Sequence, residues 1–445
     1  MDLRRQRVLA SGFHAPEPGR LEDFDRALIV LDEAGDIESV MRPGDPGYDP
    51  AGAVDLTGSV LIPGLVDLHI HAPQYPQLGT ALDVPLEDWL HRHTFPLEAR
   101  YADPGFAAAV YGALVDDLLA AGTTSAVYYA TIHDVSTCLL ADLCIAKGQR
   151  ALVGRVAMDH PDNPVWYRDA DAAAAVAGTR TVIAHVRDHP GNADARVRPI
   201  ITPRFIPACT DACLAALGAL AAETGVAVQT HVSESDWEHG HVAARHGMSD
   251  AASLDRFGLV TPHGVLAHGV FLGDADLALI RRRGAGLAHC PVSNAYFAGA
   301  VFPLRRVLDA GVRVGLGSDI SGGPQGTVWE AARAALMAAR MLESGVDAAV
   351  PAGRRGVPGA RVDAVTAFHL ATRGGAVAAG LPCGAFRPGL AFDALALRPG
   401  PGGALCLWPG EAGARRLERV LHGAARGDIA DVWVAGRRVA GAAPG

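Results

Sequence analysis

The chain has 445 residues, of which 49% are apolar and 20% are charged, and its formal net charge at pH 7 is −9. This length exceeds one typical domain and suits a large barrel with an accessory domain. The negative charge argues against a nucleic-acid-binding surface, and the sequence has no apolar run long enough to span a membrane. Small or neutral partners are therefore expected.

The first residues and the cysteines indicate a cytoplasmic location. The opening MDLRRQRVLASGFHAPEPG lacks the apolar segment of a secretory signal peptide. The seven cysteines are scattered, odd in number and free of any CxxC pair, which suits reduced thiols better than a disulfide framework. Cys209 and Cys213 lie four residues apart at an expected helix start, where a structural role is favoured over a metal role.

Both ends of the chain show strand and turn patterns. Residues 22–62 alternate apolar and polar runs broken by turns, as hairpins do. From about residue 385, LAFDALAL and DIADVWVAGRRVAG show the same pattern around a Gly/Pro-rich segment. We expect residues 1–64 and 376–445 to build one small β-sandwich domain together.

Between these ends, short apolar strands alternate with Ala/Leu-rich helical runs such as FAAAVYGALVDDLLAAG, which is typical of βα units and a parallel sheet. Eight is the number of strands that a TIM-type barrel requires. The sequence therefore predicts an α/β fold with a TIM-like (β/α)8 barrel over residues 65–375. The eight candidate strands are LVDLHIHA, TTSAVYYATIH, ALVGRVAMD, VRPIITPRF, VAVQTHVSE, GVLAHGVFL, GAGLAHCPVSN and VRVGLGSDISGG.

Polar residues gather at the carboxyl ends of these strands, where such barrels carry their chemistry. His69 and His71 are two residues apart on the first strand, so their side chains share one face. His231 ends the fifth strand and Asp319 the eighth. Three imidazoles and a carboxylate suit Zn²⁺ or Fe²⁺. The combination predicts a metal site at the barrel mouth.

The motifs PGLVDLHIHA, THVSE, LAHG, AHCPVSN and GLGSD, in this order, resemble those of the amidohydrolase superfamily. Within it, the segments HIHAPQYPQLGTALDVPLEDWLHRHTFPLEAR, AGTTSAVYYATIH, ITPRF and THVSES are most similar to guanine deaminases. The resemblance extends over nearly the whole chain. It departs from the family pattern at Ser235, where the family usually has Asn, so no role is assigned to that position.

The resemblance implies a metal-dependent enzyme that deaminates guanine to xanthine and ammonia, with one Zn²⁺ or Fe²⁺ per chain, a purine as its partner and a homodimeric state. The implied metal ligands are His69, His71, His231 and Asp319. The implied substrate contacts are Gln74, Arg204, Phe205, His231, Glu234 and Asp319.

The chemistry of the residues agrees with these contacts. A buried guanidinium at Arg204 needs an acceptor, which either the O6 carbonyl of guanine or an internal carboxylate can supply. The amide of Gln74 can donate to and accept from a purine edge, or simply lie on a surface loop. Phe205 fits either stacking on the base or packing in the core. Residues 73–100 fit a lid over the site, with Trp89 and Phe95 as apolar anchors, or ordinary packing.

Three residues are the catalytic candidates: Glu234, His268 and Asp319. Glu234 stands three residues after His231 and is the best acid and base, able to carry a proton from the attacking water to N3. Asp319 would help to protonate the departing amine. His268, at the end of the sixth strand, would stabilise the developing charge.

The lysine content bears on the metal count. Two-metal amidohydrolases commonly bridge their ions with a carboxylated lysine at the end of the fourth strand, but the only lysine, Lys147, precedes the third strand. One metal is therefore expected. Two alternatives stay open: deamination of another heterocycle (an s-triazine, cytosine, an adenosine derivative or 8-oxoguanine), and a catalytically silent relative. Gln74 and the Arg204–Phe205 pair favour a substrate with a carbonyl beside its exchanged amine.

Overall fold

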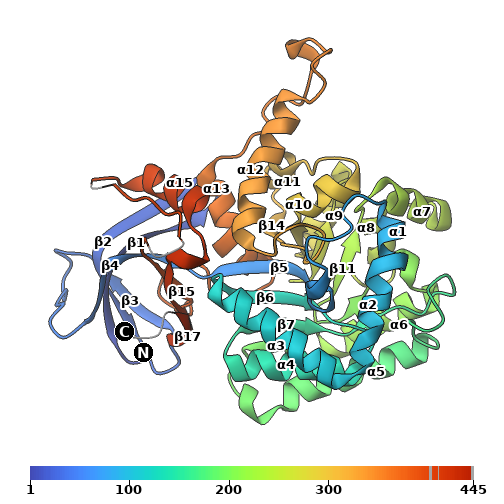
Figure 1. Ribbon diagram of the computed structural model, residues 1–445, viewed down its shortest axis with the longest axis horizontal. Coiled ribbons are helices and arrows are strands. Elements are labelled where there is room, and N and C mark those ends of the chain that lie inside the picture. Colours follow the sequence, from blue (N-terminus) through green and yellow to red (C-terminus); the bar gives the residue numbers. More distant parts are fainter. Residues whose placement is uncertain (400–402, 409, 442–445) are drawn as a thin grey trace.

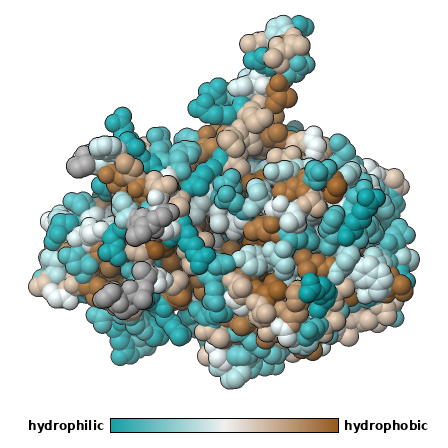
Figure 2. Space-filling model, viewed as in Figure 1, coloured by the Kyte–Doolittle hydropathy of each residue, from teal (hydrophilic) through white to brown (hydrophobic). Residues whose placement is uncertain are grey.

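The computed structural model describes residues 1–399, 403–408 and 410–441. It has a β-rich part, which carries both chain ends, beside a barrel surrounded by helices (Figure 1). On the face shown in Figure 2, hydrophilic and hydrophobic residues are interspersed. No helix in the described ranges is long and apolar enough to cross a membrane.

The β-rich part is one seven-stranded mixed sheet in the order β17-β16-β15-β4-β1-β2-β3. Antiparallel pairing of β15 with β4 brings the two ends of the chain into one sheet, and β1 and β4 run parallel. The predicted joining of both ends in a small β domain is thus found, as one continuous mixed sheet of the described residues and not as the two separate sheets of the predicted β-sandwich. Its boundaries at residues 64 and 376 stay a prediction. The strands are β1 (Arg7–Glu17), β2 (Arg20–Leu31), β3 (Ile37–Met41), β4 (Val54–Pro63), β15 (Ala394–Leu397), β16 (Ile429–Val434) and β17 (Arg437–Gly441).

The barrel has the eight predicted parallel strands, in two four-stranded sheets with the orders β5-β6-β7-β9 and β11-β12-β13-β14. A parallel bridge between Ile201 and Val228 links the two sheets. The predicted fold class, a TIM-like barrel with a small β domain, is confirmed. The barrel strands are β5 (Leu65–His71), β6 (Thr123–Tyr129), β7 (Arg150–Gly154), β9 (Val197–Pro199), β11 (Gln229–Val232), β12 (Val265–His268), β13 (Gly286–His289) and β14 (Arg313–Leu316), with the short β8 (Val156–Ala157) pairing with β10 (Thr202–Pro203).

Helices follow most barrel strands and cover the outside of the barrel (Figure 1). Several begin at a side-chain cap: Asp171, Thr210 and Thr327 each accept a hydrogen bond from a backbone N–H of the first turn. The longer ones are α3 (Pro104–Ala120), α4 (Asp134–Lys147), α5 (Ala172–Asp188), α6 (Asp211–Thr224), α7 (Asp236–His246), α9 (Asp274–Arg283), α12 (Val328–Ser344) and α15 (Gly413–Gly423). The shorter ones are α8 (Asp250–Arg256), α10 (Pro291–Ser293), α11 (Leu304–Asp309), α13 (Ala364–His369) and α14 (Gly375–Ala378).

A helical segment between β5 and α3 lies over the carboxyl ends of the strands. It consists of η1 (Ala72–Gln77), α1 (Leu86–Trp89), η2 (Leu90–Thr94), α2 (Phe95–Ala99) and η3 (Arg100–Ala102). Its apolar side chains Leu86, Trp89 and Phe95 are buried against the barrel. We call residues 72–102 the cover segment.

A buried ion pair joins the barrel to the β domain. Arg150 of β7 donates to Asp393 through Nε at 2.9 Å and Nη2 at 3.2 Å, and Asp393 also accepts from the backbone N–H of Ala435 at 2.8 Å. Both side chains of the pair are buried. Loss of one partner of such a pair typically costs about 3–5 kcal/mol, because the other charge is left buried and uncompensated.

His14 in β1 ties the two ends of the chain together. Its Nδ1 accepts from the backbone N–H of Phe386 at 3.1 Å, and its Nε2 lies 3.1 Å from Glu22 Oε2. Burial lowers the pKa of His14 to about 4; Arg387 and Arg42 act in the same direction and Glu22 opposes them. Protonation of Nδ1 would also place two N–H groups against each other.

This histidine predicts acid sensitivity. The unfolded chain binds a proton at His14 below about pH 6.5 and the folded chain only below about pH 4, so the free energy of unfolding should decrease as the pH falls from 6.5 to 4. His14→Asn keeps an acceptor toward Phe386 but does not titrate. Urea unfolding at several pH values should therefore show a shallower pH dependence for this variant. His91→Asn, at an exposed histidine, should keep the wild-type slope; identical slopes for all three proteins would contradict the prediction.

Candidate active site

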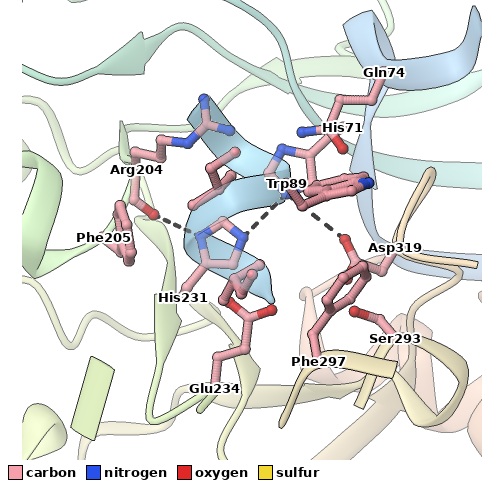
Figure 3. A pocket seen from close by; sticks show the side chains of 13 residues that line it. His71, Gln74, Trp89, Arg204, Phe205, His231, Glu234, Ser293, Phe297 and Asp319 are labelled. Atoms are coloured by element: carbon pink, nitrogen blue, oxygen red, sulfur yellow. Dashed lines mark hydrogen bonds and ion pairs between the residues drawn. The ribbon is translucent and has the colours of Figure 1, made fainter. Parts of the chain in front are cut away.

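A cavity of about 400 Å³ opens at the carboxyl ends of the barrel strands, beneath the cover segment (Figure 3). Small-molecule sites are typically concave, with apolar and aromatic side chains around a few polar groups. This cavity has that composition. It is lined by His71, Gln74, Leu86, Trp89, Leu90, Arg204, Phe205, His231, Glu234, Ser293, Phe297, Asp319 and Gly322.

The four residues predicted as metal ligands meet at the wall of this cavity. His71 Nε2 lies 3.0 Å from His231 Nε2. Asp319 Oδ1 lies 3.2 Å from His69 Nε2 and 3.7 Å from His71 Nε2. The two histidines of β5 point the same way because strand side chains alternate. One ring nitrogen from each of the three histidines lies within 4.8 Å of the other two.

The hydrogen bonding of this cluster fits a metal ion. Nδ1 of His69 and Nδ1 of His71 are buried and have no hydrogen-bond partner among the described residues, and Nε2 of His69 has only the Asp319 carboxylate at 3.2 Å, outside good hydrogen-bond geometry. Buried polar atoms are rarely left in this state. Burial lowers the pKa of both His71 and His231 well below the usual range, with neighbouring imidazoles adding to the effect. Neutral imidazoles are the form that binds metals.

A backbone carbonyl group also orients His231 for metal binding. Its Nδ1 donates to the carbonyl oxygen of Arg204 at 2.6 Å, so the lone pair of the neutral ring lies on Nε2, facing His71 (Figure 3). A hydrogen bond of this kind fixes the tautomer of ligand histidines. These four residues could therefore hold a divalent transition metal.

The three catalytic candidates adjoin the cluster. Glu234 Oε1 lies 3.6 Å and Asp319 Oδ2 lies 3.9 Å from Nε2 of His268, whose Nδ1 donates to Asn294 Oδ1 at 2.9 Å. Burial, followed by the charge of Asp319, raises the pKa of Glu234 to about 8. Burial acts to raise the pKa of Asp319 too, but His69 and His268 outweigh it and lower that pKa well below the usual range. The two carboxyl groups therefore differ in their affinity for a proton, as the paired carboxyl groups of acid–base sites do.

The backbone of the site is strained at three positions. Ser233, His268 and Asp319 have φ values of 46°, 71° and 49°, in the left-handed region that side-chain-bearing residues rarely adopt. Each such residue costs about 1–3 kcal/mol, and such strain concentrates at functional sites.

The predicted substrate contacts lie at the cavity, but Arg204 is already paired. Its Nη1 donates to Glu98 Oε2 at 2.6 Å and its Nη2 to Glu98 Oε1 at 3.1 Å, so an internal carboxylate does supply the acceptor. Gln74 Nε2 donates to the same carboxylate at 2.8 Å. The ring of Phe205 is buried, with its centroid 6.0 Å from that of His231.

Several residues at the site carried no sequence-based assignment. Glu98 is one of them, and only the need of a buried arginine for a counter-charge pointed to it. Tyr129 at the end of β6 is another; its ring centroid lies 4.8 Å from those of His69 and His71.

Trp89 of the cover segment meets Phe297 with ring centroids 5.2 Å apart, so the cover segment forms part of the cavity wall.

Lys147 and Cys209 lie outside the metal cluster, as the sequence suggested. Lys147, on the last turn of α4, forms an ion pair with Asp116 at 2.6 Å and does not line the cavity. Cys209 is buried and donates to the carbonyl oxygen of Ala157 at 3.2 Å, in keeping with a structural role.

Comparison with known proteins gives consistent results. The profile of the Amidohydrolase family matches residues 60–439. A probable guanine deaminase of Schizosaccharomyces pombe is 36% identical over 392 residues, covering 86% of this chain and 71% of the relative. A probable guanine deaminase of Deinococcus radiodurans is 31% identical over 443 residues, covering 96% of this chain and 95% of the relative. The crystal structure of guanine deaminase from C. acetobutylicum with bound guanine in the active site matches with a TM-score of 0.86 and 30% identity, over 97% of this chain and 99% of that one. The resemblance inferred from the motifs is confirmed.

The metal site is open to direct measurement. The purified protein should contain about one equivalent of a divalent transition metal per chain, and the double variant His69→Ala/His71→Ala should lose most of it, because two of the four ligands are removed. Inductively coupled plasma mass spectrometry after dialysis gives the content. The matched control is His185→Ala/His189→Ala, a histidine pair that faces Asp142 outside the cavity, and it should retain the metal. Wild-type metal content in the His69→Ala/His71→Ala variant would contradict the assignment of these residues as metal ligands.

Proposed function

Because the chain belongs to the amidohydrolase family, we propose that it is a guanine deaminase, which hydrolyses guanine to xanthine and ammonia. The observation that carries the proposal is the composition of one cavity: the amide of Gln74, the guanidinium of Arg204 and the carboxyl of Glu234 line it together with three of the candidate metal ligands. The guanine deaminase relatives support the same activity.

The polar groups of the cavity favour guanine over several alternatives. A guanidinium only donates hydrogen bonds, so Arg204 suits the O6 carbonyl of guanine. Adenine and its nucleosides carry an amine at that position, and a donor facing a donor leaves both groups unpaired. Phe205 and Trp89 would pack against the ring. Guanine and 8-oxoguanine share the carbonyl, so they compete for this site more closely than cytosine or an s-triazine.

We assign one Zn²⁺ or Fe²⁺ to His69, His71, His231 and Asp319. When bound, such an ion lowers the pKa of water and polarises the bond under attack. Lys147 lies outside the cavity, which supports one ion rather than two.

The positive charge of a bound metal ion would favour the ionised form of Glu234 against the effect of burial. In that form Glu234 begins the chemistry by accepting a proton from the water that attacks C2. The C2–O bond forms, and Glu234 passes the proton to N3, where it remains in xanthine. The position of this buried carboxyl at the cavity, three residues beyond His231, allows it to reach both water and base.

Asp319 completes the exchange. It takes the remaining proton of the former water and delivers it to the exocyclic nitrogen, so that the C2–N bond breaks, ammonia leaves and the C2 carbonyl forms. His268, held by Asn294, presents Nε2 between the two catalytic carboxyl groups. With a proton on this nitrogen as well, which burial opposes by lowering the pKa of His268, the ring would stabilise the negative charge that develops on the oxygen attacking C2. A cytoplasmic location and a homodimer remain predictions.

Replacement of the acid and base tests the mechanism. Glu234→Gln preserves size but cannot accept a proton, so kcat for ammonia release from guanine should fall about 10²–10⁴-fold while the metal content stays unchanged. Glu223→Gln, at an exposed carboxylate paired with Arg180, is the matched control and should turn over guanine at the wild-type rate. A Glu234→Gln variant with wild-type kcat would exclude this residue as the acid and base.

A substrate panel tests the specificity. Among guanine, 8-oxoguanine, adenine, cytosine and melamine, we expect guanine to give the highest kcat/KM for ammonia release. It alone combines an amine at C2 and a carbonyl at C6 with no further carbonyl on the ring. Turnover of adenine, cytosine or melamine without turnover of guanine would keep the hydrolytic site but overturn the proposed substrate.

A further inference from the structure

Glu98 of α2 is a buried carboxylate that holds two sides of the cavity wall without lining the cavity itself. Oε1 accepts from Gln74 Nε2 at 2.8 Å and from Arg204 Nη2 at 3.1 Å. Oε2 accepts from Arg204 Nη1 at 2.6 Å and from the hydroxyl of Tyr167 at 2.8 Å. An ionised carboxylate has about four lone-pair sites, so all of its accepting capacity is used. Glu98 can therefore act on a substrate only through its partners.

The first partner is the charge of Arg204. Burial by itself would lower the pKa of this guanidinium, but the charge and hydrogen bonds of Glu98 outweigh burial and raise it. The bidentate pairing with Glu98 sets a counter-charge 2.6 Å from the guanidinium, so the pair as hydrogen-bonded has no net charge. Two of the five guanidinium N–H groups bind Glu98, and the group lies over the ring of Phe95 at 4.9 Å. Arg204 therefore presents oriented donors to the cavity without an excess positive charge.

The second partner is the amide of Gln74, whose two ends differ in hydrogen bonding. A carboxylate accepts but does not donate, so Glu98 requires the NH₂ end of the amide on its side. The oxygen end accepts from the backbone N–H of Ser321 at 3.3 Å. One N–H and one lone pair of Gln74 are left for a ligand, in a fixed order.

Resting on the proposed function, we propose that Glu98 is a positioning residue that sets substrate specificity, because it cancels the charge of Arg204 and fixes the amide of Gln74. The cavity then selects a neutral base with a carbonyl acceptor and discriminates against anionic purines such as urate. Without this carboxylate, Arg204 would be a buried cation with no counter-charge, and an anion would bind in place of the neutral base.

The test measures the dissociation constants of urate and of hypoxanthine, a neutral purine with the C6 carbonyl but no C2 amine to release, for the metal-loaded protein by isothermal titration calorimetry, with KM and kcat for guanine measured in parallel. Glu98→Gln should bind urate about tenfold or more tightly than the wild type and should raise KM for guanine by a similar factor, with a smaller change in kcat. Glu98→Asp keeps the charge but shortens the side chain, so it should raise KM for guanine while binding urate as weakly as the wild type does.

The matched control is Asp393→Asn, which breaks the buried Arg150 pair at the domain junction and should leave both dissociation constants unchanged. Unaltered urate binding in folded Glu98→Gln would overturn the inference. If that variant does not fold, Glu98→Asp decides: a KM within about twofold of the wild type would overturn the inference, and a larger rise with unchanged urate binding would support it. Calorimetry needs no turnover, so a wild type that binds both ligands but releases no ammonia would refute the proposed function alone.

Discussion

Closure of the barrel between its first and last strands is the constraint on which the site depends. The backbone N–H of Asp319 donates to the carbonyl oxygen of His69 at 2.9 Å, and that of His71 donates to Ile320 at 3.0 Å. Asp67 reinforces this junction by accepting from the backbone N–H of Ser318 at 2.9 Å. These bonds place the carboxylate at the end of the eighth strand against the two imidazoles of the first.

The cover segment adds the second half of the site, and a buried ion pair joins it to the barrel. Glu98 belongs to the segment, whereas Arg204 follows the fourth strand. Because loss of one partner would leave the other charge buried, the pair couples the position of the segment to the polarity of the cavity. The same groups that close the site therefore also define its hydrogen-bonding pattern.

Burial makes the electrostatics of the cavity unusual. Imidazoles at His71 and His231 are held neutral, and two carboxyl groups, Glu234 and Asp319, have pKa values shifted in opposite directions. In water these groups would titrate close to their ordinary values. Their differences arise from which charges face each group in a region of low dielectric constant, so the fold gives two similar side chains different affinities for a proton.

Local pattern in the sequence determined the eight barrel strands and the strand-end positions of His69, His71, His231 and Asp319. Both follow from short-range rules: strand side chains alternate, and parallel strands that close into a barrel bring their carboxyl ends to one rim. The motif resemblance then identified the family.

The tertiary structure alone decided how the remaining groups are paired. The sequence left open whether Arg204 meets a substrate or an internal carboxylate. No residue near Arg204 in the sequence identifies Glu98 as its partner, because the two are 106 residues apart. The contact of Tyr129 with the imidazoles and the hydrogen bond of His268 to Asn294 could not be predicted from the sequence either. Such pairings depend on how the cover segment and the loops pack across the barrel mouth, and no periodicity along the chain encodes the distance between side chains on different loops.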